Sequence, residues 1–250
     1  MYTQWPEGRG SGEGLGSVYP QMQQRHHTQI SLPPAIAMSD VLISPPIPEV
    51  LPTPARPIRL GILASGNGSN MAAIAAAIAA GQLQATLEVV IYNNPGAKVA
   101  ARAAEYGVPA VLLNHREFAS REALDAAIID TLTAHGVNWV VMAGWMRRVT
   151  QVLIDAFPGQ MLNIHPSLLP SFPGVRAVDQ AIAAGVKVAG CTVHHVELAV
   201  DSGPTIMQAV VPVLPKDTAT TLQARIQQQE HRIYPAAIAI AAAAPSFHAR

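Results

Sequence analysis

Residues 58–80 read IRLGILASGNGSNMAAIAAAIAA, and this stretch decides the fold class. Its first seven residues form an almost unbroken apolar run, which is typical of a strand buried on both faces of a parallel sheet. Small residues follow at 65–68, and the alanine-rich run from Ser69 to Ala80 predicts a helix that ends at Gly81. A buried strand, a tight turn and a helix in direct succession begin a βαβ unit, so we predict an α/β protein.

The rest of the chain continues this alternation. Further strands are predicted at 87–92, 109–113, 139–143 and 161–164, with helices at 99–106, 120–135 and 149–157. After residue 170 the pattern predicts a helix at 178–184, an antiparallel strand pair at 188–196 and 205–213, and a last helix from Thr218 to about Tyr234, capped by Asp217 or Thr218. We therefore expect a Rossmann-like, mostly parallel sheet with helices on both faces and a C-terminal antiparallel strand pair, with ligands at the carboxyl ends of the strands.

Residues 1–57 have a different composition from the rest of the chain. They hold ten of its 21 prolines and five of its 18 glycines. Because proline removes backbone donors and interrupts helices, we predict a disordered or polyproline-like extension here and a single domain at 58–250. A tail that binds a partner and a translation start at Met38 are the alternatives for this segment.

The overall composition excludes several classes of protein. The 250 residues carry 16 basic and 16 acidic side chains, which argues against a dedicated nucleic-acid binder. The longest apolar runs have about ten residues, whereas a membrane span needs about twenty. The one cysteine, Cys191, allows neither an internal disulfide nor a cysteine-based zinc site. We expect a soluble cytoplasmic protein.

The turn at Ser65–Asn70 is the first candidate site. Its small residues let backbone N–H groups approach an anion, and the dipole of the following helix adds to the attraction. It is not the dinucleotide fingerprint, because Met71 stands at the third glycine position, and no Gly-Lys-Ser/Thr follows as in a P-loop. A phosphate site and a plain turn capped by Ser69 or Asn70 both stay open.

Asn163 and His165 form the second candidate site, at the carboxyl end of a predicted strand. Alternation places both side chains on the same side of that strand. An amide could donate to a developing oxyanion, and an imidazole could supply a proton or a positive charge, as acyl transfer requires. Asp201 could hold such a histidine protonated. Each residue also has a structural reading, as a strand-end histidine or a turn aspartate, which is favoured when it is taken alone.

The remaining polar groups give weaker evidence for a functional site. His194 and His195 are adjacent in a predicted strand and so point to opposite faces, which argues against a metal site. Cys191 is interpreted as a buried thiol. Arg147 and Arg148 fit either a solvated helix start or the edge of a ligand pocket, and Glu230 with His231 fits an exposed polar pair.

Several motifs occur together in a fixed order. They are LASGNGSN at 63–70, AGWMR at 143–147, NIHPSLLP at 163–170, DSGP at 201–204 and QEHRIYP at 229–235. In this combination the chain closely resembles the phosphoribosylglycinamide formyltransferase family, folate-dependent enzymes of purine synthesis, over residues 59–235. The NIHPSLLP signature is typical of proteins that use 10-formyltetrahydrofolate, and the SGNGSN and QEH segments narrow the resemblance to this family.

The resemblance implies the following site residues. The catalytic trio is Asn163, His165 and Asp201. Phosphoribosylglycinamide is bound by Gly68, Ser69 and Asn70 at its phosphate and by Glu230 at its ribose. The co-substrate 10-formyltetrahydrofolate is bound by Arg121, Met146, Arg147, Arg148, Val149 and Asn163. No metal, nucleic-acid or membrane partner is implied, and both a monomer and a homodimer are compatible.

Some positions depart from the usual pattern of the family, namely Arg148, His195 and the pair Leu198-Ala199. The departure at Arg148 leaves its folate contact open.

Three other functions are alternatives to this family's. A 10-formyltetrahydrofolate hydrolase would carry an N-terminal regulatory domain, for which residues 1–57 are too rich in proline. A methionyl-tRNA formyltransferase would carry a C-terminal RNA-binding domain and more positive charge. A non-catalytic folate-binding or phosphoribosyl-binding module would not need the complete trio.

Overall fold

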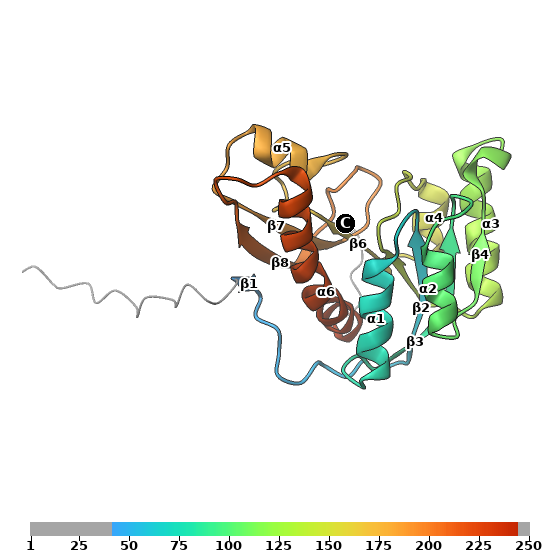
Figure 1. The fold of residues 1–250 in the computed structure, drawn as a ribbon. Coiled ribbons are helices and arrows are strands. Elements are labelled where there is room, and N and C mark those ends of the chain that lie inside the picture. Colours follow the sequence, from blue (N-terminus) through green and yellow to red (C-terminus); the bar gives the residue numbers. More distant parts are fainter. Residues whose placement is uncertain (1–41, 245–250) are drawn as a thin grey trace, which may run out of the picture. The chain divides into compact units, whose positions relative to one another are not determined.

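The structure is a computed structural model that describes residues 42–244. One eight-stranded sheet runs through this part of the chain, in the order β1-β8-β7-β6-β5-β2-β3-β4 (Figure 1). Its strands are β1 (Ile43–Ser44), β2 (Ile58–Ala64), β3 (Ala85–Tyr92), β4 (Ala110–Leu112), β5 (Trp139–Met142), β6 (Met161–His165), β7 (Val188–His195) and β8 (Thr205–Pro212). The helices are α1 (Ser69–Ala79), α2 (Val99–Glu105), α3 (Arg121–Ala134), α4 (Gln151–Ala156), α5 (Ala177–Ala183) and α6 (Ala219–Ala243), with a 3-10 turn at His115–Glu117.

The sheet changes direction at β6. Strands β2 to β6 pair in parallel, whereas β6–β7, β7–β8 and β8–β1 pair antiparallel. The predicted mostly parallel sheet with a C-terminal antiparallel pair is therefore confirmed. Because parallel strands present their carboxyl ends at one edge, the loops after β2, β5 and β6 meet there.

Both faces of the sheet are covered by apolar helix faces. Alternate side chains of β2 such as Leu60 and Ile62 pack with α1, α2 and α6, while Leu63 packs with α3 and α4 on the opposite face. Figure 1 shows α1 and α6 crossing one face of the sheet side by side. Burial on both faces explains why β2 reads as a continuous apolar run instead of an alternating one.

The structure differs from the sequence prediction at both ends of the described residues. Within the extension predicted to be disordered, Ile43 and Ser44 form β1, which pairs with Ala209 and Gln208 of β8. This two-residue strand covers an otherwise open sheet edge, and proline-rich sequence gives little sign of it. The prediction for residues 1–41 lies outside the described residues.

The last helix also extends beyond its predicted end. Thr218 caps α6 as predicted, but the helix continues through Pro235 to Ala243 because residues 236–239 and Ala241 bury their side chains almost completely in the core. Burial of this apolar face outweighs the loss of the proline N–H. No helix within residues 42–244, α6 included, is both long and apolar enough to cross a membrane.

Gly190 allows β7 and β8 to lie close together. A Cβ on this residue would overlap the carbonyl oxygen of Ala209 and crowd Leu168. We expect Gly190→Ala to lower the free energy of unfolding by about 1–3 kcal/mol, as overpacking does. Urea unfolding measures this, with Gly66→Ala as control because a Cβ there meets nothing within 4 Å. Equal stability of the two variants would contradict the account.

Candidate active site

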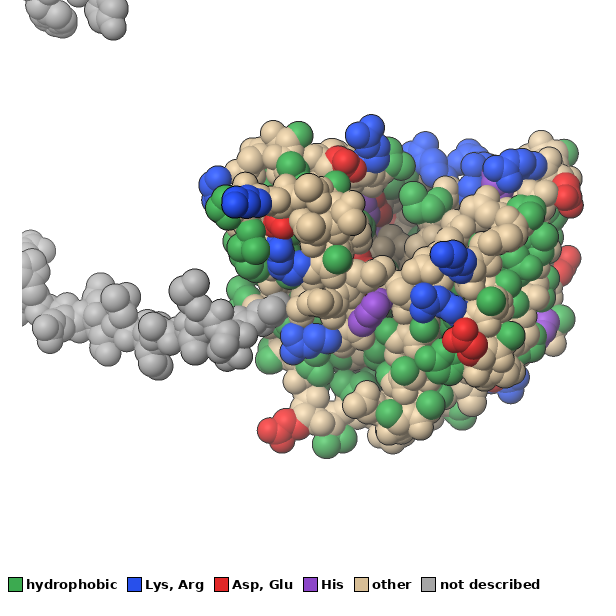
Figure 2. Space-filling view, in the orientation of Figure 1, with side chains coloured by type: hydrophobic (Ala, Val, Ile, Leu, Met, Phe, Trp, Pro, Cys, Tyr) green, Lys and Arg blue, Asp and Glu red, His purple; other side chains and the backbone are tan. Residues whose placement is uncertain are grey.

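A cavity of about 500 Å³ opens at the carboxyl ends of β2, β5 and β6. Figure 2 shows the molecule hollowed in this region, with basic side chains on the rim. Its lining includes the β2–α1 loop at 66–70, the segment 142–149 after β5, the end of β6 at 163–166, the connection 194–201, and one face of α6. The position agrees with the general rule for ligand sites in open α/β sheets.

The β2–α1 loop is shaped by glycine and closed off by α6. Gly68 has φ 74°, and a Cβ on it would lie 2.6 Å from Val99 Cγ2, so only glycine fits. Gln227 Nε2 donates to Ser69 Oγ at 2.8 Å, and Asn70 Nδ2 donates to Glu230 Oε2 at 2.8 Å. Within the described residues no side chain caps the N-terminus of α1. Its first amides are therefore suited to receive an anion from the cavity.

Glu230 is a buried acid at this end of the cavity, with 4% of its surface exposed. Burial raises its pKa, and the hydrogen bond from Asn70 opposes that shift without reversing it. Since the Asn70 amide that donates to it is neutral, ionisation of Glu230 in the folded protein is costly. The sequence reading of an exposed polar pair is therefore wrong for this residue.

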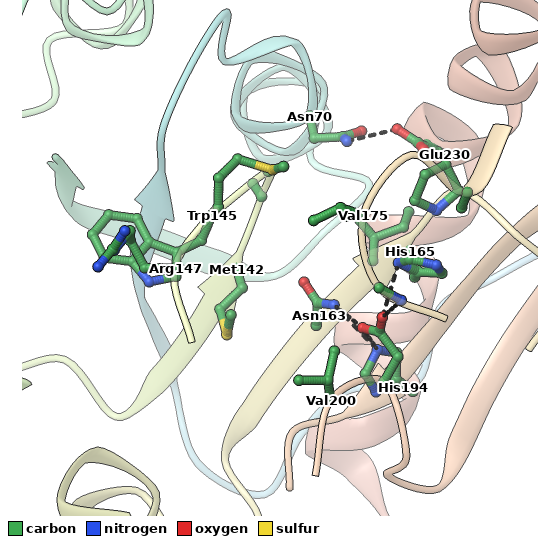
Figure 3. A pocket seen from close by; sticks show the side chains of 18 of the residues that line it. Asn70, Met142, Trp145, Arg147, Asn163, His165, Val175, His194, Val200 and Glu230 are labelled. Atoms are coloured by element: carbon green, nitrogen blue, oxygen red, sulfur yellow. Dashed lines mark hydrogen bonds and ion pairs between the residues drawn. The ribbon is translucent and has the colours of Figure 1, made fainter. Parts of the chain in front are cut away.

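The second end of the cavity holds Asn163, His165 and Asp201, and Asp201 contacts both of the others. Figure 3 shows Asn163 and His165 at this end. Asn163 and His165 lie on β6, two residues apart and on the same side of the strand. Asp201 comes from the β7–β8 connection and has φ 53°. His165 Nδ1 is 3.3 Å from Asp201 Oδ2, and Asn163 Nδ2 is 3.4 Å from Asp201 Oδ1. The sequence could place the first two together, and the structure adds the third.

Both ring nitrogens of His165 face acceptors. Nδ1 lies at the Asp201 carboxylate, and Nε2 lies 2.9 Å from the carbonyl oxygen of Phe172. Carboxylate and carbonyl oxygens only accept, so the imidazolium, with a proton on each nitrogen, is the form that satisfies both contacts. The side chain is 8% exposed, which limits screening of the ion pair by water.

Asp201 is held in its ionised form. Burial alone would raise its pKa, but the His194 side chain, the backbone amide of Gly174 and the charge of His165 together lower it below its ordinary value. The Gly174 amide donates to Asp201 Oδ2 at 2.7 Å. The carboxylate lies 3.3 Å from His165 Nδ1, as one of the two sequence readings of Asp201 requires, and its role there stays a prediction.

The structure brings most of the predicted ligand-binding residues to one cavity. Its lining contains the predicted substrate residues Gly68, Ser69, Asn70 and Glu230, and the predicted folate residues Met146, Arg147, Arg148, Val149 and Asn163. Arg121 does not line it; this exposed residue begins α3. Met146 is anchored through its amide, which donates to Ser65 Oγ at 2.8 Å. The predicted folate segment is thus hydrogen-bonded directly to the predicted phosphate loop.

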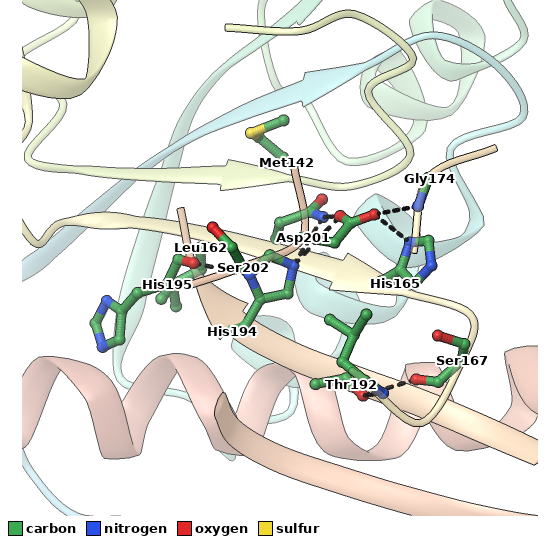
Figure 4. A network of polar contacts seen from close by, with 12 residues as sticks. Met142, Leu162, His165, Ser167, Gly174, Thr192, His194, His195, Asp201 and Ser202 are labelled. Atoms are coloured by element: carbon green, nitrogen blue, oxygen red, sulfur yellow. Dashed lines mark hydrogen bonds and ion pairs between the residues drawn. The ribbon is translucent and has the colours of Figure 1, made fainter. Parts of the chain in front are cut away.

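Sequence reasoning missed several contributors. His194 contacts Asn163, and the backbone of Phe172 and Gly174 contacts His165 and Asp201 of the predicted trio. Figure 4 shows Gly174 and His194 beside Asp201. Backbone groups leave no trace in a residue pattern, but the alternation that separates His194 from His195 could have placed His194 on the side of β7 that faces the site. The described residues contain no group of three or more metal-ligating side chains. Burial raises the pKa of the Cys191 thiol far above its ordinary value, as expected of a structural thiol.

Comparisons with known proteins find relatives that cover most of the described residues. The formyl transferase family matches residues 58–238. A phosphoribosylglycinamide formyltransferase of Bacillus subtilis is 40% identical over 180 residues, which cover 72% of this chain and 92% of the relative. A crystal structure of glycinamide ribonucleotide transformylase 1 from Symbiobacterium toebii has 48% identity and a TM-score of 0.73, over 74% of this chain and 88% of that one.

A second kind of relative is much longer than this chain. The trifunctional purine biosynthetic protein adenosine-3 of Homo sapiens is 40% identical over 184 residues, or 74% of this chain. This chain spans only 18% of that relative's length. The match therefore concerns one portion of the trifunctional protein, whereas the bacterial relatives match over most of their length. The resemblance expected from the sequence motifs is confirmed.

The burial of Glu230 generates a prediction about stability. Because the folded state raises its pKa, stability of the native protein falls as pH rises above the ordinary value of 4.5, where the unfolded chain releases this proton first. Glu230→Gln keeps an oxygen for Asn70 and has no proton to lose. We expect the variant to be more stable than the native protein at neutral pH and equal to it in acid.

Urea unfolding across a pH series measures this difference. Glu105→Gln, on the exposed side of α2, is the matched control and should leave the pH dependence unchanged. A Glu230→Gln variant with the pH profile of the native protein would show that Glu230 ionises without cost, contrary to its burial.

Proposed function

The chain belongs to the formyl transferase family, and we propose that it moves the formyl group of 10-formyltetrahydrofolate to the amine of phosphoribosylglycinamide. The products are phosphoribosyl-N-formylglycinamide and tetrahydrofolate. Its relatives are named for this transferase and for purine biosynthesis, and its enzyme class is theirs.

One observation carries the proposal: a single cavity joins an anion-binding helix N-terminus to an Asn–His–Asp cluster. The acceptor substrate has a phosphate at one end and the reacting amine at the other, so it needs both features. Gly68, Ser69 and Asn70 would hold the phosphate through the open amides of α1. Glu230, beside Asn70, would bind the ribose hydroxyls.

The donor substrate would enter from the segment that follows β5. Met146–Val149 would present backbone groups to the pterin, while the exposed guanidinium groups of Arg147 and Arg148 would face the anionic tail of the folate. Arg121 lies outside this lining, so its predicted contact requires the tail to extend toward the start of α3.

The chemistry follows from the charges around β6. The amine attacks the formyl carbon and the carbonyl oxygen becomes an oxyanion. Asn163 donates a hydrogen bond to this oxyanion, and the imidazolium of His165 supplies a proton or a positive charge next to it. Asp201 holds His165 protonated and helps to transfer the proton lost by the amine to the departing folate nitrogen. Each donor is in place before the charge develops, which is how such sites lower the barrier.

Hydrolysis of 10-formyltetrahydrofolate is not favoured. The matched relatives are named as transferases, and water as acceptor would give the open amides of α1 nothing to bind. The cytoplasmic location and a monomeric or dimeric state stay predictions.

The proposal is tested by release of tetrahydrofolate from 10-formyltetrahydrofolate with and without phosphoribosylglycinamide. We expect release of tetrahydrofolate only when the acceptor is present, since the attacking amine belongs to the acceptor. Equal release in both mixtures would establish a hydrolase, and release in neither, from folded protein that binds both compounds, would establish a binding module.

The catalytic roles give a second prediction. Asn163→Ala and His165→Ala should each lower kcat by about 10²–10³-fold or more, because each removes a group that stabilises the oxyanion. Steady-state kinetics measure this, and circular dichroism checks that both variants are folded. Ser202→Ala is the control, since Ser202 is exposed and its hydroxyl donates only to the nearby Ala199 carbonyl. Native turnover in either of the first two variants would refute its assigned role.

A further inference from the structure

His194 is a buried histidine to which the proposed reaction gives no role. It lies on β7 directly opposite Asn163 in the β6–β7 pairing. Only 2% of its surface is exposed, yet it contributes to the lining of the cavity. It therefore touches the site without being open to bulk water, which is the position of a residue that orients another.

The hydrogen bonds of His194 fix which nitrogen carries its proton. Nδ1 lies 2.7 Å from the carbonyl oxygen of His195, and a carbonyl only accepts, so Nδ1 is the donor. In a neutral ring Nε2 is then an acceptor. It lies 3.1 Å from Asn163 Nδ2, which donates to it. Asp201 Oδ1 is 3.7 Å from the same nitrogen, farther away than Asn163 Nδ2, so the amide is the closer partner of Nε2.

This arrangement directs the amide of Asn163. Figure 3 shows its nitrogen on the side of His194. One N–H is taken by His194, and the other faces Asp201 Oδ1 across 3.4 Å, a long contact that an entering formyl oxygen can replace. Without His194 only the long 3.4 Å contact with Asp201 holds the amide, which then turns over more readily because the terminal torsion of asparagine is broad. Its carbonyl oxygen would then face the oxyanion and repel it.

We propose that His194 is a positioning residue for formyl transfer. The neutral ring, protonated on Nδ1, accepts one N–H of Asn163 and thereby keeps the second N–H available to the oxyanion. This inference rests on the proposed function, because it assigns His194 an effect only through the oxyanion contact of Asn163.

Two substitutions separate the roles of the ring nitrogens. In His194→Asn the shorter amide reaches the position of Nδ1 and leaves nothing at Nε2, whereas in His194→Gln the longer side chain places an oxygen where Nε2 lies. We expect His194→Asn to lower kcat by at least about tenfold, up to the 10²–10³-fold cost of one oxyanion donor. KM for both substrates should stay within about twofold. His194→Gln should recover most of kcat.

A double-mutant cycle decides whether His194 acts through Asn163. In an Asn163→Ala background, His194→Asn should change kcat by less than about twofold, because the group it positions is already absent. If the fold-losses in kcat of the two single variants multiply in the double variant, the proposal is overturned. Native kcat in His194→Asn, or an effect on KM alone, would also overturn it. If the Asn variant is unfolded at the assay temperature, His194→Gln carries the test, and a loss as large as that of Asn163→Ala would overturn the proposal.

His195→Asn is the matched control, since it makes the same change at the next residue of β7 and keeps the backbone carbonyl that anchors His194. It should leave kcat within about twofold of native. The native protein is assayed first. If it transfers the formyl group and the fold-losses in kcat multiply, the role of His194 is wrong and the proposed function stands. If it does not transfer the formyl group, the role of His194 and the proposed function are both wrong.

Discussion

The pairing of β6 governs the whole site. On one side β6 continues the parallel sheet through β5, and on the other it pairs antiparallel with β7, so it belongs to both halves of the sheet. Its carboxyl end lies beside the β2–α1 loop because of the parallel half. Its partner strand brings His194 opposite Asn163, and the connection after β7 returns Asp201 to the same side of the sheet. Neither half alone would bring the proposed phosphate site and the proposed acid–base cluster into one cavity.

The surroundings of the two acids that line the cavity, Asp201 and Glu230, shift their pKa values in opposite directions. Asp201 has two histidines and a backbone amide around it, and its pKa is lowered despite burial. Glu230 is more deeply buried and accepts a hydrogen bond from the neutral amide of Asn70, and its pKa is raised. Opposed environments of this kind give one carboxylate a fixed charge and leave the other able to share a proton in hydrogen bonds to hydroxyl groups. The charge is thus concentrated where the proposed oxyanion forms.

Local sequence was enough to predict most of this architecture. The apolar run of β2, the glycine turn and the spacing of Asn163 and His165 are short-range patterns, and the structure keeps them. The pairing of β1 with β8, the continuation of α6 past Pro235 and the burial of Glu230 depend on groups far away in the chain. Such contacts follow from tertiary packing, which propensity does not encode. The contact of His194 with Asn163 is of the same kind.

Backbone strain shows how closely fold and site depend on each other. Between residues 42 and 244 three non-glycine residues have positive φ, namely Phe172, Arg176 and Asp201, and all lie in the two connections around the trio. Each such conformation costs on the order of 1–3 kcal/mol and persists only where surrounding contacts hold it. The Phe172 carbonyl accepts from His165, and the Asp201 carboxylate accepts from Gly174. The same charged hydrogen bonds that prepare the imidazolium therefore hold the strained backbone, so a change that neutralises His165 would loosen the loop as well as remove the charge.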